Sequence, residues 1–197
     1  LFGTDGIRGE AGRFPLDTET VNAIGFSLGS HLAERTTTPQ IVIGRDTRES
    51  GEAIERALIA GATRAGAKCM SAGIITTPGV AFLTRHLQAS AGVVISASHN
   101  PYQDNGIKIF APSGQKMDDL VERQIERDIF DKKGIPAQTE SAPRSPETEE
   151  KLDEDYLSFL ANDIGKGLSL DGLTIVVDCA NGASSAFAPV LFERLGA

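Results

Sequence analysis

The stretch Val93-Val94-Ile95-Ser96-Ala97-Ser98-His99-Asn100-Pro101-Tyr102-Gln103-Asp104-Asn105-Gly106-Ile107-Lys108-Ile109-Phe110 decides the fold of this chain. Its first three residues are apolar and β-branched and predict a buried strand, which ends where polar, turn-forming residues and Pro101 follow. The run Asp104-Asn105-Gly106 predicts a turn, after which residues 107–110 return as a second strand. If the two strands pair, Ser98 and Lys108 lie near each other at one rim of the sheet. A hydroxyl on a loop at a strand end, with a cation beside it, is a candidate phosphoryl-transfer site.

Strands and helices alternate around this stretch. Short apolar runs predict further buried strands at residues 40–44 and 67–72. Four helices are predicted to begin at polar residues that can serve as N-caps, which are Asp17, Ser50, Thr77 (followed by Pro78) and Asp118. The alternation predicts an α/β fold, namely a three-layer α/β/α domain with a mixed, mostly parallel sheet in which residues 107–110 run antiparallel.

The composition changes after residue 131. Residues 132–150 are rich in proline, serine and threonine and contain almost no large apolar side chain, which is typical of a linker. A helix around Tyr156, a strand at residues 173–177 and a helix around Leu191 follow. One strand between two helices cannot close a sheet. We therefore expect residues 1–131 to form one domain and residues 151–197 to be the incomplete start of a second, similar domain.

Composition and charge argue against several classes of protein. The 197 residues are 40% hydrophobic and 23% charged, as in an ordinary soluble globular protein. A net charge of −8 without a basic stripe argues against nucleic acid, and no apolar run is long enough for a membrane span. Cys69 and Cys179 show neither disulfide nor zinc-site spacing, so we expect two reduced, mostly buried thiols in a cytoplasmic protein.

Glycine recurs at every third position from Gly3 to Gly12 and allows tight turns or close approach of a ligand. Between the glycines, Arg8 has a planar guanidinium group that suits a phosphate. The spacing is equally compatible with a structural Arg8–Asp5 ion pair in a tight hairpin. The charged turn at residues 45–51 could also contact a ligand, but a salt-bridged connection from strand to helix is the favoured interpretation.

Several chemistries can be weighed for Ser98. Neighbouring side chains of an extended segment point to opposite faces, so His99 is not expected to act as a base for Ser98, and no Gly-x-Ser-x-Gly elbow surrounds it. Glycine-rich nucleotide fingerprints are absent, and His31 and His86 fall on predicted helices far from His99, which argues against a shared metal. A phosphorylated Ser98, with Arg8 and Lys108 neutralising the transferred group, remains as the active interpretation beside a plain capped loop.

Four motifs resemble those of the α-D-phosphohexomutases. Residues 96–101, followed by residues 104–108, resemble the phosphoserine loop of that family. The family's opening motif, its internal strand-to-helix motif and the start of its second domain are matched by residues 2–9, 44–51 and 176–182. The four motifs occur in the family's order and span essentially the whole chain. The opening and phosphoserine motifs are most similar to the amino-sugar branch of the family.

The resemblance implies a four-domain enzyme that interconverts glucosamine 6-phosphate and glucosamine 1-phosphate through a bisphosphorylated sugar. Ser98 would be the phosphorylated nucleophile, with Arg8 and Lys108 at the phosphoryl-transfer centre and His99 and Asn100 shaping the loop. Arg8, Asn100 and Lys108 would bind phosphate. Mg²⁺ would be held through the Ser98 phosphate, with its remaining ligands outside this chain, so the chain alone is expected to be inactive.

Alternatives remain at this point. The family also contains phosphoglucomutases and phosphomannomutases, and a non-catalytic α/β module could use the Ser98 loop only to hold an anion. The expected partner is a small sugar phosphate, without nucleic acid or membrane, and a homodimer is the assembly considered.

Overall fold

The computed structural model describes residues 1–131, 147–148 and 151–197, and its centre is a mixed sheet. The strands stand in the order β1-β5-β4-β2-β3-β6. Their bounds are Ile7–Glu10 (β1), Gln40–Arg45 (β2), Lys68–Ile74 (β3), Ala91–Ile95 (β4), Asp104–Phe110 (β5) and Glu147–Thr148 (β6). The neighbours β4, β2, β3 and β6 are parallel, whereas β5 is antiparallel to both β4 and β1. The predicted mixed, mostly parallel sheet is confirmed.

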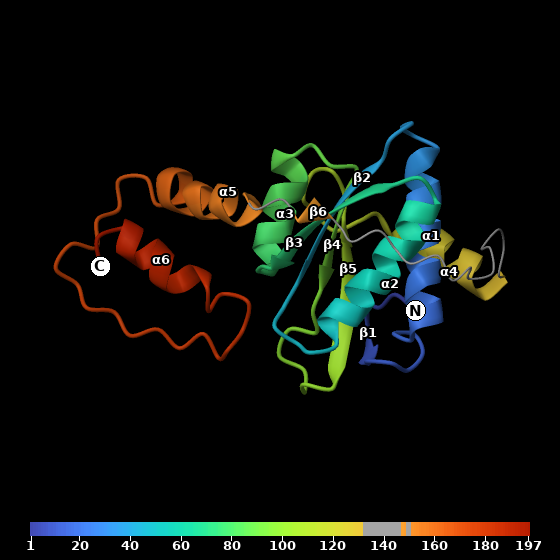
Figure 1. The fold of residues 1–197 in the computed structure, drawn as a ribbon, viewed down its shortest axis with the longest axis horizontal. Coiled ribbons are helices and arrows are strands. Elements are labelled where there is room, and N and C mark those ends of the chain that lie inside the picture. Colours follow the sequence, from blue (N-terminus) through green and yellow to red (C-terminus); the bar gives the residue numbers. More distant parts are fainter. Residues whose placement is uncertain (132–146, 149–150) are drawn as a thin grey trace.

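Helices cover both faces of this sheet, which gives the predicted three layers (Figure 1). One face carries α1 (Thr18–Ala33), α2 (Gly51–Arg64) and α4 (Asp119–Asp131). The other face carries α3 (Thr77–His86) and α5 (Leu152–Phe159), and α6 (Phe187–Arg194) packs beside α5. Asp17 caps α1 as predicted, because its carboxylate accepts a hydrogen bond from the Thr20 amide at 2.9 Å.

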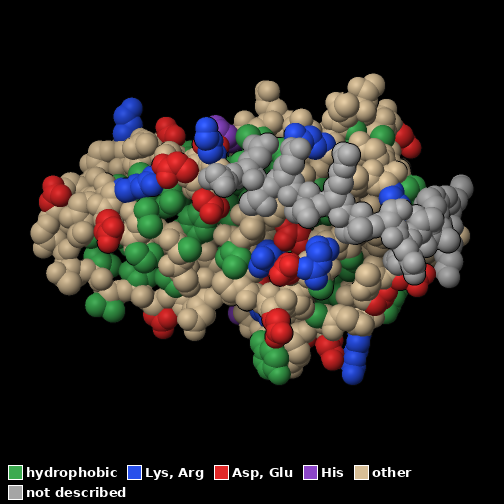
Figure 2. All heavy atoms as spheres, in the orientation of Figure 1, with side chains coloured by type: hydrophobic (Ala, Val, Ile, Leu, Met, Phe, Trp, Pro, Cys, Tyr) green, Lys and Arg blue, Asp and Glu red, His purple; other side chains and the backbone are tan. Residues whose placement is uncertain are grey.

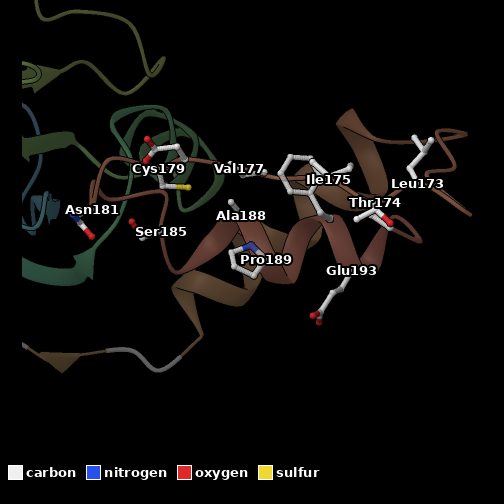
Figure 3. Close-up of a pocket in the computed structure, with 13 residues that line it drawn as sticks. Leu173, Thr174, Ile175, Val177, Cys179, Asn181, Ser185, Ala188, Pro189 and Glu193 are labelled. Atoms are coloured by element: carbon white, nitrogen blue, oxygen red, sulfur yellow. The ribbon is translucent and has the colours of Figure 1, made fainter.

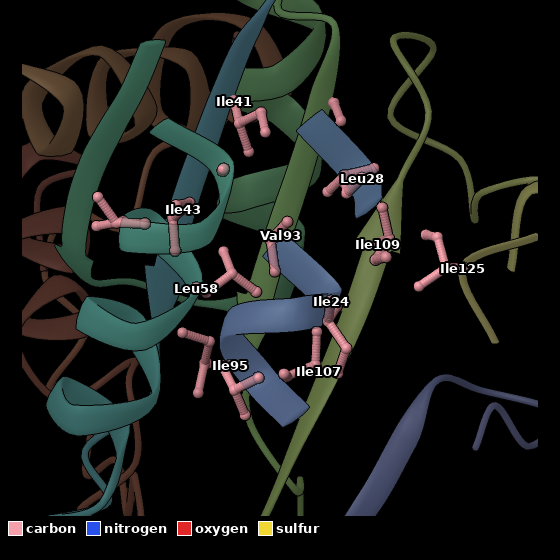
Figure 4. Packing of buried hydrophobic residues seen from close by; sticks show 14 of the residues in the cluster. Ile24, Leu28, Ile41, Ile43, Leu58, Val93, Ile95, Ile107, Ile109 and Ile125 are labelled. Atoms are coloured by element: carbon pink, nitrogen blue, oxygen red, sulfur yellow. The ribbon is translucent and has the colours of Figure 1, made fainter. Parts of the chain in front are cut away.

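Successive side chains of the strands point to opposite faces of the sheet and belong to two hydrophobic clusters, one on each face. Ile41 and Ile43 of β2 lie against the first set of helices, while Val42 between them lies against the second. The first cluster joins side chains from five strands, β1 to β5, and from α1, α2 and α4. Figure 4 shows part of it, including Ile24, Leu28, Leu58, Val93, Ile95, Ile107, Ile109 and Ile125. Each such buried side chain contributes about 1.5–3 kcal/mol relative to an exposed one, so the sheet is held rigidly between the layers.

Two boundaries differ from the sequence-based expectation. The predicted turn at residues 104–106 instead begins β5, because β1 pairs with it in the register Arg8↔Gly106 and Glu10↔Asp104. We did not predict β1, since a glycine at every third position obscures strand alternation. The N-cap of α3 is Thr76 rather than Thr77, and its hydroxyl accepts from the Gly79 amide.

The C-terminal part confirms one expectation and corrects another. A helix does surround Tyr156, and α5 continues as a short π-helix at Leu160–Ile164. Residues 173–177 were predicted as a strand but form an extended segment without a ladder partner among the described residues, and Val176 is 96% exposed. The apolar run is strand-like, but a strand forms only where a neighbouring backbone supplies hydrogen bonds. The predicted linker lies outside the described residues, apart from the two that form β6.

The surface carries mixed charge on the face shown in Figure 2. Lys and Arg side chains lie among Asp and Glu side chains there, and hydrophobic side chains are visible where residues 151–197 lie. Within the described ranges, no helix combines the length and the apolar character that crossing a bilayer requires.

Candidate active site

The loop between β4 and β5 carries Ser98 at one end of the sheet. Ile95 and Ile107 form a pair of the β4–β5 ladder, and the Ser96 amide donates to the Gly106 carbonyl at 2.9 Å, so the loop proper begins after Ser96. Ser98 is exposed and has a φ of 57°, in the left-handed region that non-glycine residues adopt uncommonly. The hydroxyl is therefore accessible, on a loop whose two ends are fixed by the sheet.

His99 lies beside the Ser98 hydroxyl rather than on the opposite face. The distance from Ser98 Oγ to His99 Nδ1 is 3.4 Å. Our expectation of opposite faces assumed an extended backbone and was wrong, because the positive φ of Ser98 turns the chain. A hydrolase would still need a third group to orient the histidine, and among the described residues His99 has no hydrogen-bond partner besides Ser98.

Arg8 reaches the same loop from the edge strand. Because β1 pairs with β5 in the register Arg8↔Gly106, the guanidinium group lies beside the loop. Arg8 Nη1 donates to Asn100 Oδ1 at 3.4 Å, and Asn100 Nδ2 donates to Asp104 Oδ2 at 3.0 Å. The side chain of Asn100 thus connects Arg8 with the base of the loop.

Lys108 lies on β5 opposite Val94 and points toward the N-terminal segment. Its Nζ is 2.5 Å from Asp5 Oδ2, and the same oxygen is 3.4 Å from Arg8 Nη2. The hydrogen bond from Lys108, helped by the charges of Lys108 and Arg8, lowers the pKa of Asp5 below its usual value. Arg8 therefore forms the structural ion pair with Asp5 that its spacing allowed, and it also contacts the Ser98 loop, where it could meet a phosphate.

A glycine allows this approach of the N-terminal segment to β5. Gly6 has a φ of 91°, and a Cβ there would lie 2.4 Å from the carbonyl oxygen of Ile107 and 2.9 Å from Lys108 Cγ. Only glycine fits such a position, which lets the preceding Asp5 reach Lys108.

Asp46 supports the loop from the end of β2. Its Oδ2 accepts a hydrogen bond from Ser96 Oγ at 2.7 Å, and Ser96 Oγ in turn accepts one from the Ser98 amide at 3.0 Å. The backbone amide of Asp46 also donates to the Ile95 carbonyl at 3.0 Å. A carboxylate of the turn at residues 45–51 therefore fixes the backbone at Ser98.

Arg48 is the residue of this site that the sequence did not reveal. Its guanidinium group donates to four backbone carbonyls of the loop, those of Ser98, Asn100, Pro101 and Asp104. The turn is salt-bridged as expected, since Arg45 pairs with Glu55 at 3.0 Å and Arg48 with Asp46 at 3.1 Å. That interpretation did not include the hydrogen bonds from Arg48 to the loop. The only signal in the sequence was an Arg-Asp-Thr-Arg turn at the end of a strand predicted to lie in the same sheet as the Ser98 loop.

The described residues do not complete a metal site. No group of three or more His, Cys, Asp or Glu side chains in the described ranges is arranged to hold a metal ion. Near Ser98, Asp5 is paired with Lys108 and Asp46 with Arg48 and Ser96, so these carboxylates are already engaged. The residues present therefore do not fit a Mg²⁺ ion by themselves.

A cavity of about 660 Å³ lies elsewhere, between residues 173–179 and α6 (Figure 3). It is lined by Ile175, Cys179, Pro189 and neighbouring residues, and none of the predicted site residues contributes to it. One contact connects its rim to the site region, since Thr47 Oγ1 donates to the Asn181 carbonyl at 2.8 Å.

Comparison with known proteins identifies the family. Residues 1–135 match the family described as phosphoglucomutase/phosphomannomutase, alpha/beta/alpha domain I. This chain belongs to the phosphoglucomutase/phosphomannomutase family. Phosphoglucosamine mutases of Koribacter versatilis and Solibacter usitatus are 47% and 49% identical to it over 199 and 197 residues, which cover 100% of the chain and 43% of each relative. The family resemblance inferred from the four motifs is confirmed.

Solved structures of the same family share the fold. The crystal structure of a phosphoglucomutase/phosphomannomutase family protein from Burkholderia thailandensis superposes with a TM-score of 0.79 at 25% identity. The match covers 99% of this chain and 42% of that protein. The chain thus spans less than half the length of these family members.

Proposed function

We propose that this chain is the phosphoserine-bearing part of a phosphoglucosamine mutase. The observation that carries the proposal is the exposed Ser98 hydroxyl on a rigidly held loop, with Arg8 at its side and Lys108 linked to Arg8 through Asp5. Two relatives that are 47% and 49% identical over the whole chain are named phosphoglucosamine mutase, which supports glucosamine phosphates as substrates.

The reaction would move a phosphoryl group between Ser98 and the sugar. A sugar hydroxyl attacks phosphorus, its O–P bond forms as the Ser98 Oγ–P bond breaks, and the hydroxyl proton ends on Ser98 Oγ. His99 Nδ1, 3.4 Å from that oxygen, is placed to deliver this proton. In the return step Ser98 Oγ attacks the other phosphate of the bisphosphorylated sugar. The bond from that phosphorus to the sugar oxygen breaks, the sugar oxygen takes up the proton, and phosphoserine is restored. Arg8 and Lys108 would neutralise the transferred group, since phosphoryl transfer depends mainly on positioning and charge stabilisation.

A Mg²⁺ ion is part of this proposal for the whole enzyme only. The phosphate on Ser98 would supply one oxygen ligand, and the described residues do not supply the others. We also propose residues 1–131 as the first domain, 132–150 as a linker and 151–197 as the start of the second, together with a homodimeric assembly. Two free thiols fit the proposed cytoplasmic location.

Turnover of a full-length enzyme containing these residues tests the proposal. We expect conversion of glucosamine 6-phosphate to glucosamine 1-phosphate, and complete loss with Ser98→Ala. Lys108→Ala should lower kcat by about 100-fold or more, by analogy with loss of one charge-stabilising donor, at an unchanged melting temperature. A large fall in melting temperature would show that Lys108 is structural.

Three alternatives predict different results. The Burkholderia protein's family name favours glucose and mannose phosphates as the second candidate substrates, and a higher kcat/KM on these would reassign the sugar. Binding of inorganic phosphate without any turnover would indicate a non-catalytic anion-binding module. Labelling of Ser98 by a fluorophosphonate would indicate a serine hydrolase.

A further inference from the structure

Arg48 is a largely buried cation that one carboxylate holds in place. Its side chain is 10% exposed, and its Nε lies 3.1 Å from Asp46 Oδ2. The backbone amide of Arg48 donates to the other oxygen of Asp46 at 3.0 Å. Both carboxylate oxygens are therefore used to fix one arginine, which is the arrangement that a desolvated guanidinium group requires.

The rest of the guanidinium group binds the Ser98 loop. Nη1 donates to the carbonyls of Pro101 and Asp104 at 2.6 and 2.9 Å, and Nη2 donates to those of Ser98 and Asn100 at 2.9 Å each. With the Nε–Asp46 bond, all three nitrogens of the group are engaged. An arginine offers five N–H donors in one plane, whereas a lysine is a single point charge on a flexible stem.

Both peptide groups that flank Ser98 are thereby fixed. The Ser98 amide donates to Ser96 Oγ, and the Ser98 carbonyl accepts from Arg48. The left-handed backbone at Ser98 is unfavourable by about 1–2 kcal/mol and persists only where its surroundings determine it. Since Asp46 binds both Ser96 and Arg48, one carboxylate joins the two supports.

We propose that Arg48, anchored by Asp46, is a positioning residue for phosphoryl transfer through Ser98. This inference rests on the proposed function. Arg48 binds only backbone carbonyls of the loop, so it acts through the orientation of Ser98 Oγ. A displacement of a reacting atom by about 1 Å can lower a rate about 100-fold, so the loss of Arg48 should appear mainly in kcat.

The matched control is Arg45, which lies three residues earlier in the same turn. It has a similarly small exposed fraction of 20% and also pairs with a carboxylate, but that partner is Glu55 of α2. Among the described residues it donates no hydrogen bond to the Ser98 loop. Arg45→Ala thus removes a mostly buried positive charge from the same turn without removing a contact to the Ser98 loop.

The variants Arg48→Ala, Arg48→Lys and Arg45→Ala are compared in the full-length enzyme, with kcat, KM and melting temperature measured and activity expressed per folded molecule. We expect Arg48→Ala to lower kcat by about 100-fold with little change in KM. The kcat of Arg48→Lys should stay near that of Arg48→Ala, because one ammonium group cannot donate hydrogen bonds to four carbonyls. Added guanidinium ion should partly restore Arg48→Ala, and Arg45→Ala should keep the wild-type kcat.

Three results would overturn the inference while the proposed function stands. These are a wild-type kcat in Arg48→Ala, full recovery by Arg48→Lys, or an equal kcat loss in Arg45→Ala. If Arg48→Ala does not fold, kcat is measured for Arg48→Lys and Asp46→Asn instead. A wild-type kcat in both of these variants would contradict the positioning role of Arg48. A wild-type enzyme without mutase turnover would instead refute the proposed function, and this inference with it.

Discussion

Lys108 Nζ and Asp5 Oδ2 are 2.5 Å apart although the two residues are separated by 103 positions in the chain. The contact exists because β5 lies between β4 and the edge strand β1, so the glycine-rich N-terminus folds over the strand that carries Lys108. Asp5 therefore holds two cations of the candidate site, Lys108 and Arg8, in place before any anion binds. A phosphate would meet a pair of cations that is already ordered.

Replacing Lys108 should change the titration of Asp5. The hydrogen bond from Lys108 is the main cause of the lowered pKa, so Lys108→Met should return the pKa of Asp5 toward its usual value near 3.8. Side-chain carboxyl NMR titration measures the shift. Asp119 is the control, because its lowered pKa depends on Lys116 and should not move. An unchanged pKa of Asp5 would contradict the contact.

Replacing Gly6 should destabilise the fold more than replacing Gly12. Both have a positive φ, but a Cβ at Gly6 would meet the Ile107 carbonyl at 2.4 Å, whereas at Gly12 nothing lies within 4 Å. Gly12→Ala should lower the free energy of unfolding by about 1–2 kcal/mol through backbone strain alone. Gly6→Ala adds a backbone clash and should exceed that, at about 3 kcal/mol or more. Urea denaturation of both variants measures the difference, and equal losses would argue against the close approach.

The contact between α5 and α6 should weaken in acid. Arg194 donates two hydrogen bonds to Glu154, at 2.8 and 2.7 Å, and lowers the pKa of Glu154 to about 2 from the usual value of 4.5. A carboxyl group with a lowered folded-state pKa stabilises the fold above pH 4.5, and this contribution is lost as the pH falls from about 4.5 to about 2. Arg194→Gln should raise the pKa of Glu154 toward 4.5, as read by NMR titration, while the remaining hydrogen bond from the Ser158 hydroxyl keeps it somewhat below that value. A Glu154 that still titrates near 2 in this variant would show that Arg194 is not the main cause of its lowered pKa.

The two cysteines should differ in reactivity. Cys69 is buried, and burial raises the pKa of its thiol to about 11, so little reactive thiolate is present at neutral pH. Cys179 is only partly buried. We expect a thiol reagent to modify Cys179 rapidly in the native protein and Cys69 only after unfolding. The variant Cys179→Ser should then show no rapid phase, and a remaining rapid phase would contradict the burial of Cys69.

The sequence predicted the parts of the site that depend on local pattern. The β-branched run before Ser96 and the returning strand around Lys108 specify a hairpin, and pairing of these strands follows from their apolar faces. The accessible Ser98 at the hairpin end could be predicted for that reason. Its positive φ could not, because it depends on the hydrogen bonds to Ser96 and Arg48, so the relation to His99 was misjudged.

The remaining features depend on contacts between distant segments. Arg48 meets a loop about fifty positions away, and nothing in the turn itself distinguishes it from Arg45. The edge strand β1 is specified by its pairing with β5 rather than by its own glycine-rich composition. Residues 173–177 show the converse case, since this apolar, strand-like run pairs with no strand among the described residues.

The covalent state of Ser98 tests the central claim most directly. The full-length enzyme is incubated with glucosamine 1,6-bisphosphate, digested and analysed by mass spectrometry that resolves Ser98 from Ser96, which is buried and bonded to Asp46. We predict one phosphate, on Ser98 and not on Ser96, and none in the Ser98→Ala variant. An unmodified Ser98, or phosphate elsewhere on the same peptide, would contradict the account.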